Sequence, residues 1–158
     1  MIRSAFLGGR GLTAGEVAMQ RAMFGDAIPP ERVRIYPYNF WWPFPNDRAI
    51  TPAGSIYFPP RDYRDDYSAA DVPLWLKALF MHESTHVYQW HGLGWWVFAR
   101  GPFDRNYSYD IVPGRRFEEY GLEQMGMLVQ DYWTLTHGGR VPGKAYTPAD
   151  YAHLLPLA

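Results

Sequence analysis

In the middle of the chain, residues 74–81 are apolar at every position except Lys77, and no helix breaker follows them until Gly92. Asp71 is a suitable N-cap and Pro73 suits a first helical turn, so a helix is predicted from this point to Gly92. Its first half has almost no polar side, which indicates burial on most sides. A buried helix that also carries histidine and glutamate needs a chemical explanation.

Three other segments have the signals of helices. Residues 14–24 are predicted to be helical because Thr13 and Glu16 have the spacing of a capping box. Residues 116–136 have a helical pattern and are expected to form one continuous helix. Residues 147–155 begin with a threonine cap and a proline, which predicts a last short helix.

Short β-rich runs precede the central helix. Residues 32–36 and 55–58 are expected to be strands, and the Pro-Ala-Gly turn at 52–54 joins the second of them to residues 49–51. These runs predict a small antiparallel sheet. Residues 93–116 have no clear periodicity and read as a long loop with room for one short element. The expected fold class is therefore α+β.

Composition supports a single compact domain covering residues 1–158. Apolar residues make up 47% of the chain and charged residues 20%, as expected for a protein with a real core. The net charge is -1 and the basic residues are scattered, so no nucleic-acid partner is expected. The Pro-rich aromatic segment 36–46 reads as a loop over the core, with contact to a substrate as the second interpretation.

The chain begins without an apolar run of signal-peptide length, and no segment approaches the length of a membrane span. Neither a signal peptide nor a membrane span is therefore expected, and the sequence leaves the localisation open. Because the chain has no cysteine, any metal chemistry would depend on histidine, aspartate and glutamate.

The central helix carries the pattern HExxH, at His82, Glu83 and His86. Two imidazoles four residues apart lie on one helix face and can bind one ion, and the glutamate between them can act as a general base. The alternative is a pair of core histidines satisfied by hydrogen bonds, but burying three such groups without a metal is costly. The pattern therefore predicts a zinc site of the zincin type.

A catalytic zinc needs a third protein ligand. The extended motif HExxHxxGxxH is excluded, because Gln89 and Gly92 stand where it requires glycine and histidine. The helix predicted at 116–136 offers Glu118, Glu119 and Glu123, and spacing alone does not choose among them. Apolar neighbours surround Glu123, whereas the other two lie at what reads as a solvated helix start, so Glu123 is the preferred ligand.

The chain resembles the Vgr-related zinc metallopeptidase domains, which occur alone or as C-terminal extensions of type VI secretion spike proteins. The matching stretches are 10–16 (RGLTAGE), 24–26 (FGD), 56–58 (IYF), 82–89 (HESTHVYQ) and 120–124 (YGLEQ), of which the last two are the most specific. In this family the glutamate of the YGxEQ stretch looks like the third zinc ligand, which corresponds to Glu123. The chain has Met125 and Gly126 where the family usually has glutamine and alanine, so the helix is expected to be looser or more closely packed there.

The expected activity is that of a gluzincin-like zinc metallopeptidase. A metal-activated water would hydrolyse a peptide bond, with Glu83 as general base, in a fold where a small sheet packs on the HExxH helix and a second helix supplies the third ligand. The resemblance implies an effector or toxin of type VI secretion, made in the cytoplasm and exported, with a spike component or an immunity protein as partner. The alternatives are a non-catalytic zinc-stabilised binding module and an enzyme that cleaves peptide crosslinks of the bacterial cell wall.

Several other residues have weaker signals. Tyr107 and Tyr109 lie between the ligand segments, where a phenol could stabilise an oxyanion. Packing in the core is the common alternative role for either tyrosine, and Tyr109 is the one predicted to act in catalysis. Asp131 could orient a ligand imidazole or face solvent. The remaining histidines are expected to be surface or capping residues; they are His91, His137 and His153.

Overall fold

The computed structural model describes residues 8–40, 47–100 and 104–157. Part of the aromatic segment predicted as a loop, residues 41–46, lies outside these ranges. Within them, no helix is both long enough and apolar enough to cross a membrane.

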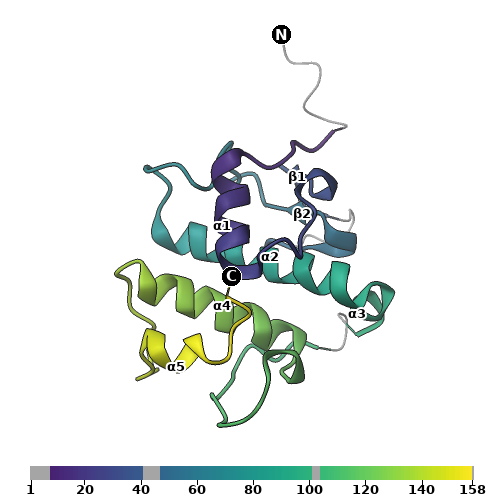
Figure 1. Ribbon diagram of the computed structural model, residues 1–158. Coiled ribbons are helices and arrows are strands. Elements are labelled where there is room, and N and C mark those ends of the chain that lie inside the picture. Colours follow the sequence, from purple (N-terminus) through teal and green to yellow (C-terminus); the bar gives the residue numbers. More distant parts are fainter. Residues whose placement is uncertain (1–7, 41–46, 101–103, 158) are drawn as a thin grey trace.

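The centre of the domain is a pair of helices, α2 (Leu74–Leu93) and α4 (Leu122–Thr136), which lie side by side (Figure 1). They pack against each other more extensively than any other pair of described elements. Helix α1 (Ala14–Phe24) packs on α2, and α5 (Pro148–Ala152) packs on α4. A short helix, α3 (Trp95–Arg100), follows α2 within the segment expected to be mostly loop. The domain is therefore mostly helical.

Helix α2 forms where the apolar run predicts it, and its first half is buried. Leu76, Phe80 and Met81 have no exposed surface. Pro73, and not Asp71, occupies the N-cap position, because its carbonyl accepts the first intrahelical hydrogen bond, from the amide of Leu76 at 3.0 Å. This apolar half fixes α2 in the core and so fixes the motif that follows it.

The helix predicted at 116–136 is not continuous. A 3-10 turn, η3 (Phe117–Glu119), is separated from α4 by extended backbone at Tyr120 and Gly121. At the start of α4, the amide of Leu122 donates to the Asp104 carboxylate at 2.6 Å. The side-chain oxygen of Gln124 accepts from the Gly121 amide at 2.9 Å. These caps stabilise a new helix start and turn it away from the preceding segment.

The sheet is smaller than expected and its central pairing is parallel, so the predicted antiparallel sheet is wrong in this respect. β1 (Ile35–Tyr36) pairs with β2 (Ile56–Tyr57) in parallel, with Ile35 opposite Ile56 and Tyr36 opposite Tyr57. Within the described residues, antiparallel pairing is limited to isolated bridges, of which Ile50 with Tyr57 spans the predicted Pro-Ala-Gly turn. The turn and the antiparallel pairing across it were thus recognised, but the parallel pairing of β1 with β2 was not.

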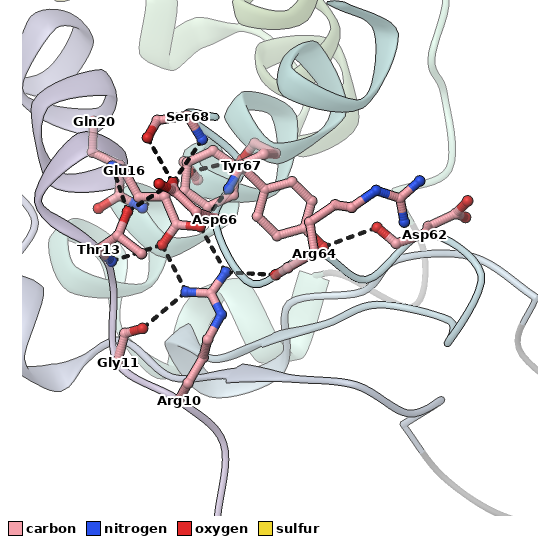
Figure 2. Close-up of polar contacts among 12 residues, drawn as sticks. Arg10, Gly11, Thr13, Glu16, Gln20, Asp62, Arg64, Asp66, Tyr67 and Ser68 are labelled. Atoms are coloured by element: carbon pink, nitrogen blue, oxygen red, sulfur yellow. Dashed lines mark hydrogen bonds and ion pairs between the residues drawn. The ribbon is translucent and has the colours of Figure 1, made fainter. Parts of the chain in front are cut away.

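A buried charge pair ties the start of α1 to the segment before α2 (Figure 2). The carboxylate of Glu16, which has no exposed surface, accepts two hydrogen bonds from the Arg10 guanidinium at 2.6 and 2.8 Å. The same carboxylate accepts from the Thr13 amide, in the predicted capping box, and from the Tyr67 amide at 2.8 Å. Arg10 also donates to the carbonyl of Arg64 at 2.8 Å. We call Arg10, Thr13, Glu16, Arg64 and Tyr67 the α1 clamp.

Helix α1 is joined directly to the motif helix as well. The Gln20 side chain donates to the hydroxyl of Ser84 at 2.9 Å, and both residues are buried. Ser84 follows Glu83 in the chain, so the α1 clamp and this hydrogen bond together hold the part of α2 that carries the candidate site.

Candidate metal centre

The two motif histidines project from the same face of α2. Their Nε2 atoms are 3.2 Å apart, since residues four apart in a helix lie one above the other. His82 is 4% exposed, and the His86 side chain is 12% exposed. Both imidazoles therefore direct the same nitrogen into one small, largely enclosed space.

Glu123, in the first turn of α4, completes the group. Its Oε2 atom lies 3.1 Å from Nε2 of His82 and 3.3 Å from Nε2 of His86. These three residues form a group of potential metal ligands within the described part of the chain. The break before α4 leaves Glu118 and Glu119 on a separate turn, where both are exposed and Glu119 pairs with Arg116.

The three donor atoms fit a small tetrahedral ion. With metal–ligand bonds of about 2.0–2.1 Å, neighbouring donors around zinc stand about 3.3 Å apart. The separations of 3.1, 3.2 and 3.3 Å form a nearly equilateral triangle of this size. One coordination position would remain open, which is the arrangement of catalytic zinc sites.

The electrostatics of the group also favour a cation. Burial by itself lowers the pKa of His86, but the hydrogen bond and charge of Glu123, with the charge of Glu83, outweigh it and raise the pKa to about 9. Burial tends to raise the pKa of Glu123, but the two imidazoles hold it at about 2. The carboxylate thus stays ionised and attracts a proton onto His86, which a divalent cation would replace.

Gln89 orients His86, a role that sequence reasoning did not assign. Its Oε1 atom lies 2.8 Å from Nδ1 of His86, and its Nε2 atom donates to the Leu122 carbonyl at 3.0 Å. Gln89 is 1% exposed. Because its oxygen accepts the Nδ1 proton, Nε2 of His86 is left free for the metal. Its position three residues after His86 on the helix was the available signal.

Gly126 allows α4 to approach His82 closely. A Cβ atom at this position would lie 2.7 Å from Nε2 and Cε1 of the His82 ring, closer than real side chains pack. The helix was expected to be either looser or more closely packed at Met125 and Gly126, and the structure shows the closer packing. On another side, the ring of Tyr107 stacks against His82 with centroids 6.3 Å apart and an angle of 22°.

Glu83 lies beside the three donors but outside the group. It is 4% exposed, and its Oε2 atom accepts a hydrogen bond from the Thr51 hydroxyl at 2.5 Å. Thr51 precedes the 3-10 turn η2 (Pro52–Gly54), which packs on α2. The predicted turn region therefore supplies a partner to Glu83, and sequence reasoning did not identify this role for Thr51.

The other candidates lie in different surroundings. The Tyr109 hydroxyl donates to Asp131 at 2.5 Å and lies 2.7 Å from the Tyr151 hydroxyl, all within the core. Asp131 is 4% exposed, so it does not face solvent. The histidines outside the motif do not join the donor group; His137 stacks on Trp133 near the end of α4.

Comparison with known proteins identifies a relative. No protein-family model matches the chain. A curated relative, the type VI secretion system spike protein VgrG2b of Pseudomonas aeruginosa, is 32% identical over 133 residues. The match covers 79% of this chain but only 13% of the length of the relative.

Comparison with solved structures identifies the same protein. The solved structure of the effector domain of Pseudomonas aeruginosa VgrG2b superposes with a TM-score of 0.70 and 26% sequence identity. This match covers 93% of the present chain and 82% of that domain. Sequence and fold therefore agree that the chain is homologous to the effector domain of VgrG2b, and it carries a candidate metal site formed by His82, His86 and Glu123.

Proposed function

We propose that this domain is a zinc-dependent peptidase. The observation that carries the proposal is the arrangement of His82, His86 and Glu123, whose donor atoms match the spacing of zinc ligands, with the Glu83 carboxylate beside them. A site that only stabilised the fold would normally be closed by four protein ligands and would not need a buried carboxylate next to it. Three donors and a neighbouring base are the arrangement of a hydrolytic site.

The chemistry divides between the ion and the protein. Zinc in such a site lowers the pKa of water to about 7 and polarises the carbonyl of a substrate. Glu83 accepts a proton from the attacking water and passes it to the departing amine. The hydrogen bond from Thr51 to one carboxylate oxygen holds Glu83 in place, so that the other oxygen is available for this proton transfer.

Tyr107 and Tyr109 are the candidates for stabilising the oxyanion. Burial raises the pKa of Tyr107, the carboxylates of Glu123 and Glu83 raise it further, and the nearby Arg48 guanidinium lowers it. Tyr107 therefore lies among the site residues, whereas the hydroxyl of Tyr109 is engaged with Asp131. We favour Tyr107 for this role, and the preference for Tyr109 stays an untested prediction.

The biological setting follows from the relative. VgrG2b is a type VI secretion spike protein with an effector domain. By homology, we propose that this domain acts as a secreted effector or toxin, with a protein or peptide as substrate. In type VI secretion, its binding partners would be a spike component or an immunity protein.

The test compares wild type with Glu83→Gln, since the amide can still accept the Thr51 hydrogen bond but cannot take a proton. We expect Glu83→Gln to keep its fold and zinc content, and to lose about 10² to 10⁴ in cleavage rate. The matched control is Glu118→Gln, an exposed glutamate on η3. Circular dichroism and metal analysis check the fold and the metal.

The substrate panel contains denatured proteins and purified cell wall, each analysed by mass spectrometry. Toxicity is measured in the bacterial cytoplasm and, with an added signal sequence, in the periplasm. Cleavage confined to cell-wall peptides would keep the chemistry and change the substrate. A folded, zinc-loaded Glu83→Gln variant as active or toxic as wild type would instead favour the non-catalytic binding module.

A further inference from the structure

The two imidazoles of the candidate centre are supported unequally. Nδ1 of His86 has a hydrogen-bond partner in Gln89. Nδ1 of His82 is buried and has no hydrogen-bond partner. A histidine that binds a metal through Nε2 carries a proton on Nδ1, and burying that donor without an acceptor costs about 1–3 kcal/mol.

Asp131 is a buried carboxylate that could accept a hydrogen bond from Nδ1 of His82. It lies on α4, two turns after Glu123, and is 4% exposed. One oxygen, Oδ2, accepts from the hydroxyl of Tyr109 at 2.5 Å. Burial raises the pKa of Asp131, while the hydrogen bond from Tyr109 and the charges of Lys144 and His82 act to lower it. The charge of His82 is thus among those that act on this carboxylate.

Asp131 lies beside the turn of α2 that precedes His82. Asp131 lines a cavity of about 410 Å³ together with Ala78 and Leu79, which form the turn of α2 just before His82. Side chains on a helix lean toward its N-terminus, so the His82 ring leans toward that turn.

We infer that Asp131 is the positioning residue for His82. With a metal bound at Nε2, the Nδ1 proton of His82 is donated to Oδ1 of Asp131, while Tyr109 donates to Oδ2. In this arrangement Asp131 orients His82 as Gln89 orients His86. The Tyr109 hydroxyl in turn holds the Asp131 carboxylate in position. This inference rests on the proposed metal centre, although it does not require that the centre be catalytic.

The first test measures zinc affinity by competition with a chelator in wild type, Asp131→Asn and Tyr109→Phe. We expect Asp131→Asn to lose about 10- to 100-fold in affinity, as outer hydrogen-bond partners of metal ligands do. Tyr109→Phe should lose less, because it removes only the support of the carboxylate. Asp110→Asn, at an exposed position in the same region, is the control and should bind zinc like wild type.

The second test begins with wild type, so its first result does not depend on the folding of a variant. In zinc-loaded wild type, ¹H–¹⁵N spectra of the histidine side chains should show a downfield, slowly exchanging Nδ1 proton on His82. This proton should move upfield in Asp131→Asn. Wild-type zinc affinity in a folded Asp131→Asn variant, or a His82 Nδ1 proton that exchanges rapidly with water in wild type, would overturn the inference. Zinc binding with the expected spectra but no peptide cleavage would defeat only the proposed peptidase activity.

Discussion

At the scale of single residues, the candidate centre depends on the space left free around the ligands as much as on the ligands themselves. Gly126 leaves the face of the His82 ring open to α4, and Gln89 holds Nδ1 of His86. Neither residue belongs to the donor group, but each limits the orientation of one imidazole. Substitutions at such positions should therefore alter metal affinity without removing a ligand.

Gly126→Ala provides a direct test of this close approach. The new methyl group would collide with the His82 ring, so we expect zinc affinity to fall at least about tenfold, the lower end of the effect of disturbing a ligand's support. Gly92→Ala is the matched control, because it is also a helical glycine and a Cβ atom there meets nothing within 4 Å. Chelator competition measures both affinities, and equal values would contradict the packing argument.

The third ligand can be tested in the same assay. Glu123→Ala should weaken zinc binding at least about tenfold, since the variant loses one of three protein donors. Glu118→Ala should bind zinc as wild type does, because Glu118 is exposed on the separate turn η3. Indistinguishable affinities for the two variants would remove Glu123 from the proposed ligand set.

The three members of the candidate donor group could be predicted from the sequence because HExxH is a local pattern on a helix, and because apolar neighbours marked Glu123 as the carboxylate to be buried. The roles of Gln89, Gly126 and Thr51 could not be predicted in the same way. Each depends on another element, α4 or η2, reaching α2 at a particular point. Such distances between segments are not encoded in the spacing of residues along one helix.

At the scale of elements, the local signals identified helices better than strands. The capping box at Thr13 and Glu16 is present, because its hydrogen bonds form within one turn. The parallel pairing of β1 and β2 depends instead on the path of the chain between them, which propensity does not specify. The break before α4 depends partly on Asp104, far from Leu122 in sequence, so a continuous helix was the natural but incorrect expectation.

The α1 clamp leads to a prediction about stability. Arg10→Ala would leave the fully buried Glu16 carboxylate without its charged partner, so we expect the free energy of unfolding to fall by about 3–5 kcal/mol. Arg21→Ala is the control, since its ion pair with Asp26 is on the surface and should contribute less than about 1 kcal/mol. Urea denaturation of both variants measures the difference, and losses of equal size would argue against the clamp.

At the scale of the whole molecule, the candidate centre joins the two main helices. His86 on α2 and Glu123 on α4 are far apart in sequence, so their attraction forms only in the folded domain. The stability of the metal-free protein should therefore depend on the protonation of this pair. A bound metal would join the same helices in place of the shared proton and would stabilise the fold by mass action.

The sign of the pH dependence follows from the direction of each shift. The pKa of His86 is raised to about 9, so its contribution to stability is complete below its ordinary value near 6.5 and is lost as the pH rises through 9. The pKa of Glu123 is lowered to about 2, so its contribution is present above its ordinary value near 4.5 and is lost as the pH falls through 2. Both contributions are present between about pH 4.5 and 6.5.

We therefore expect the thermal midpoint of chelator-treated protein to fall between about pH 6.5 and 9. His86→Gln should remove most of this fall, because the group that loses its proton is absent. Differential scanning calorimetry across this range provides the measurement. A metal-free midpoint that stays level or rises over the same interval would show that the His86–Glu123 pair does not stabilise the fold.

The segment before α4 is held at both ends by contacts that do not involve its exposed middle. Asp104 caps the helix that carries Glu123, and the Tyr120 hydroxyl accepts from the Val112 amide at 3.0 Å. Between these anchors, residues 105–108 are exposed, and Tyr107 extends from them over His82. Exchange of the side chains on either side of Tyr107, at Arg105, Asn106 and Ser108, could therefore change which molecules the proposed site accepts, while the candidate ligands keep their positions. Grafting this stretch from one homologue to another is accordingly a rational route to altered specificity.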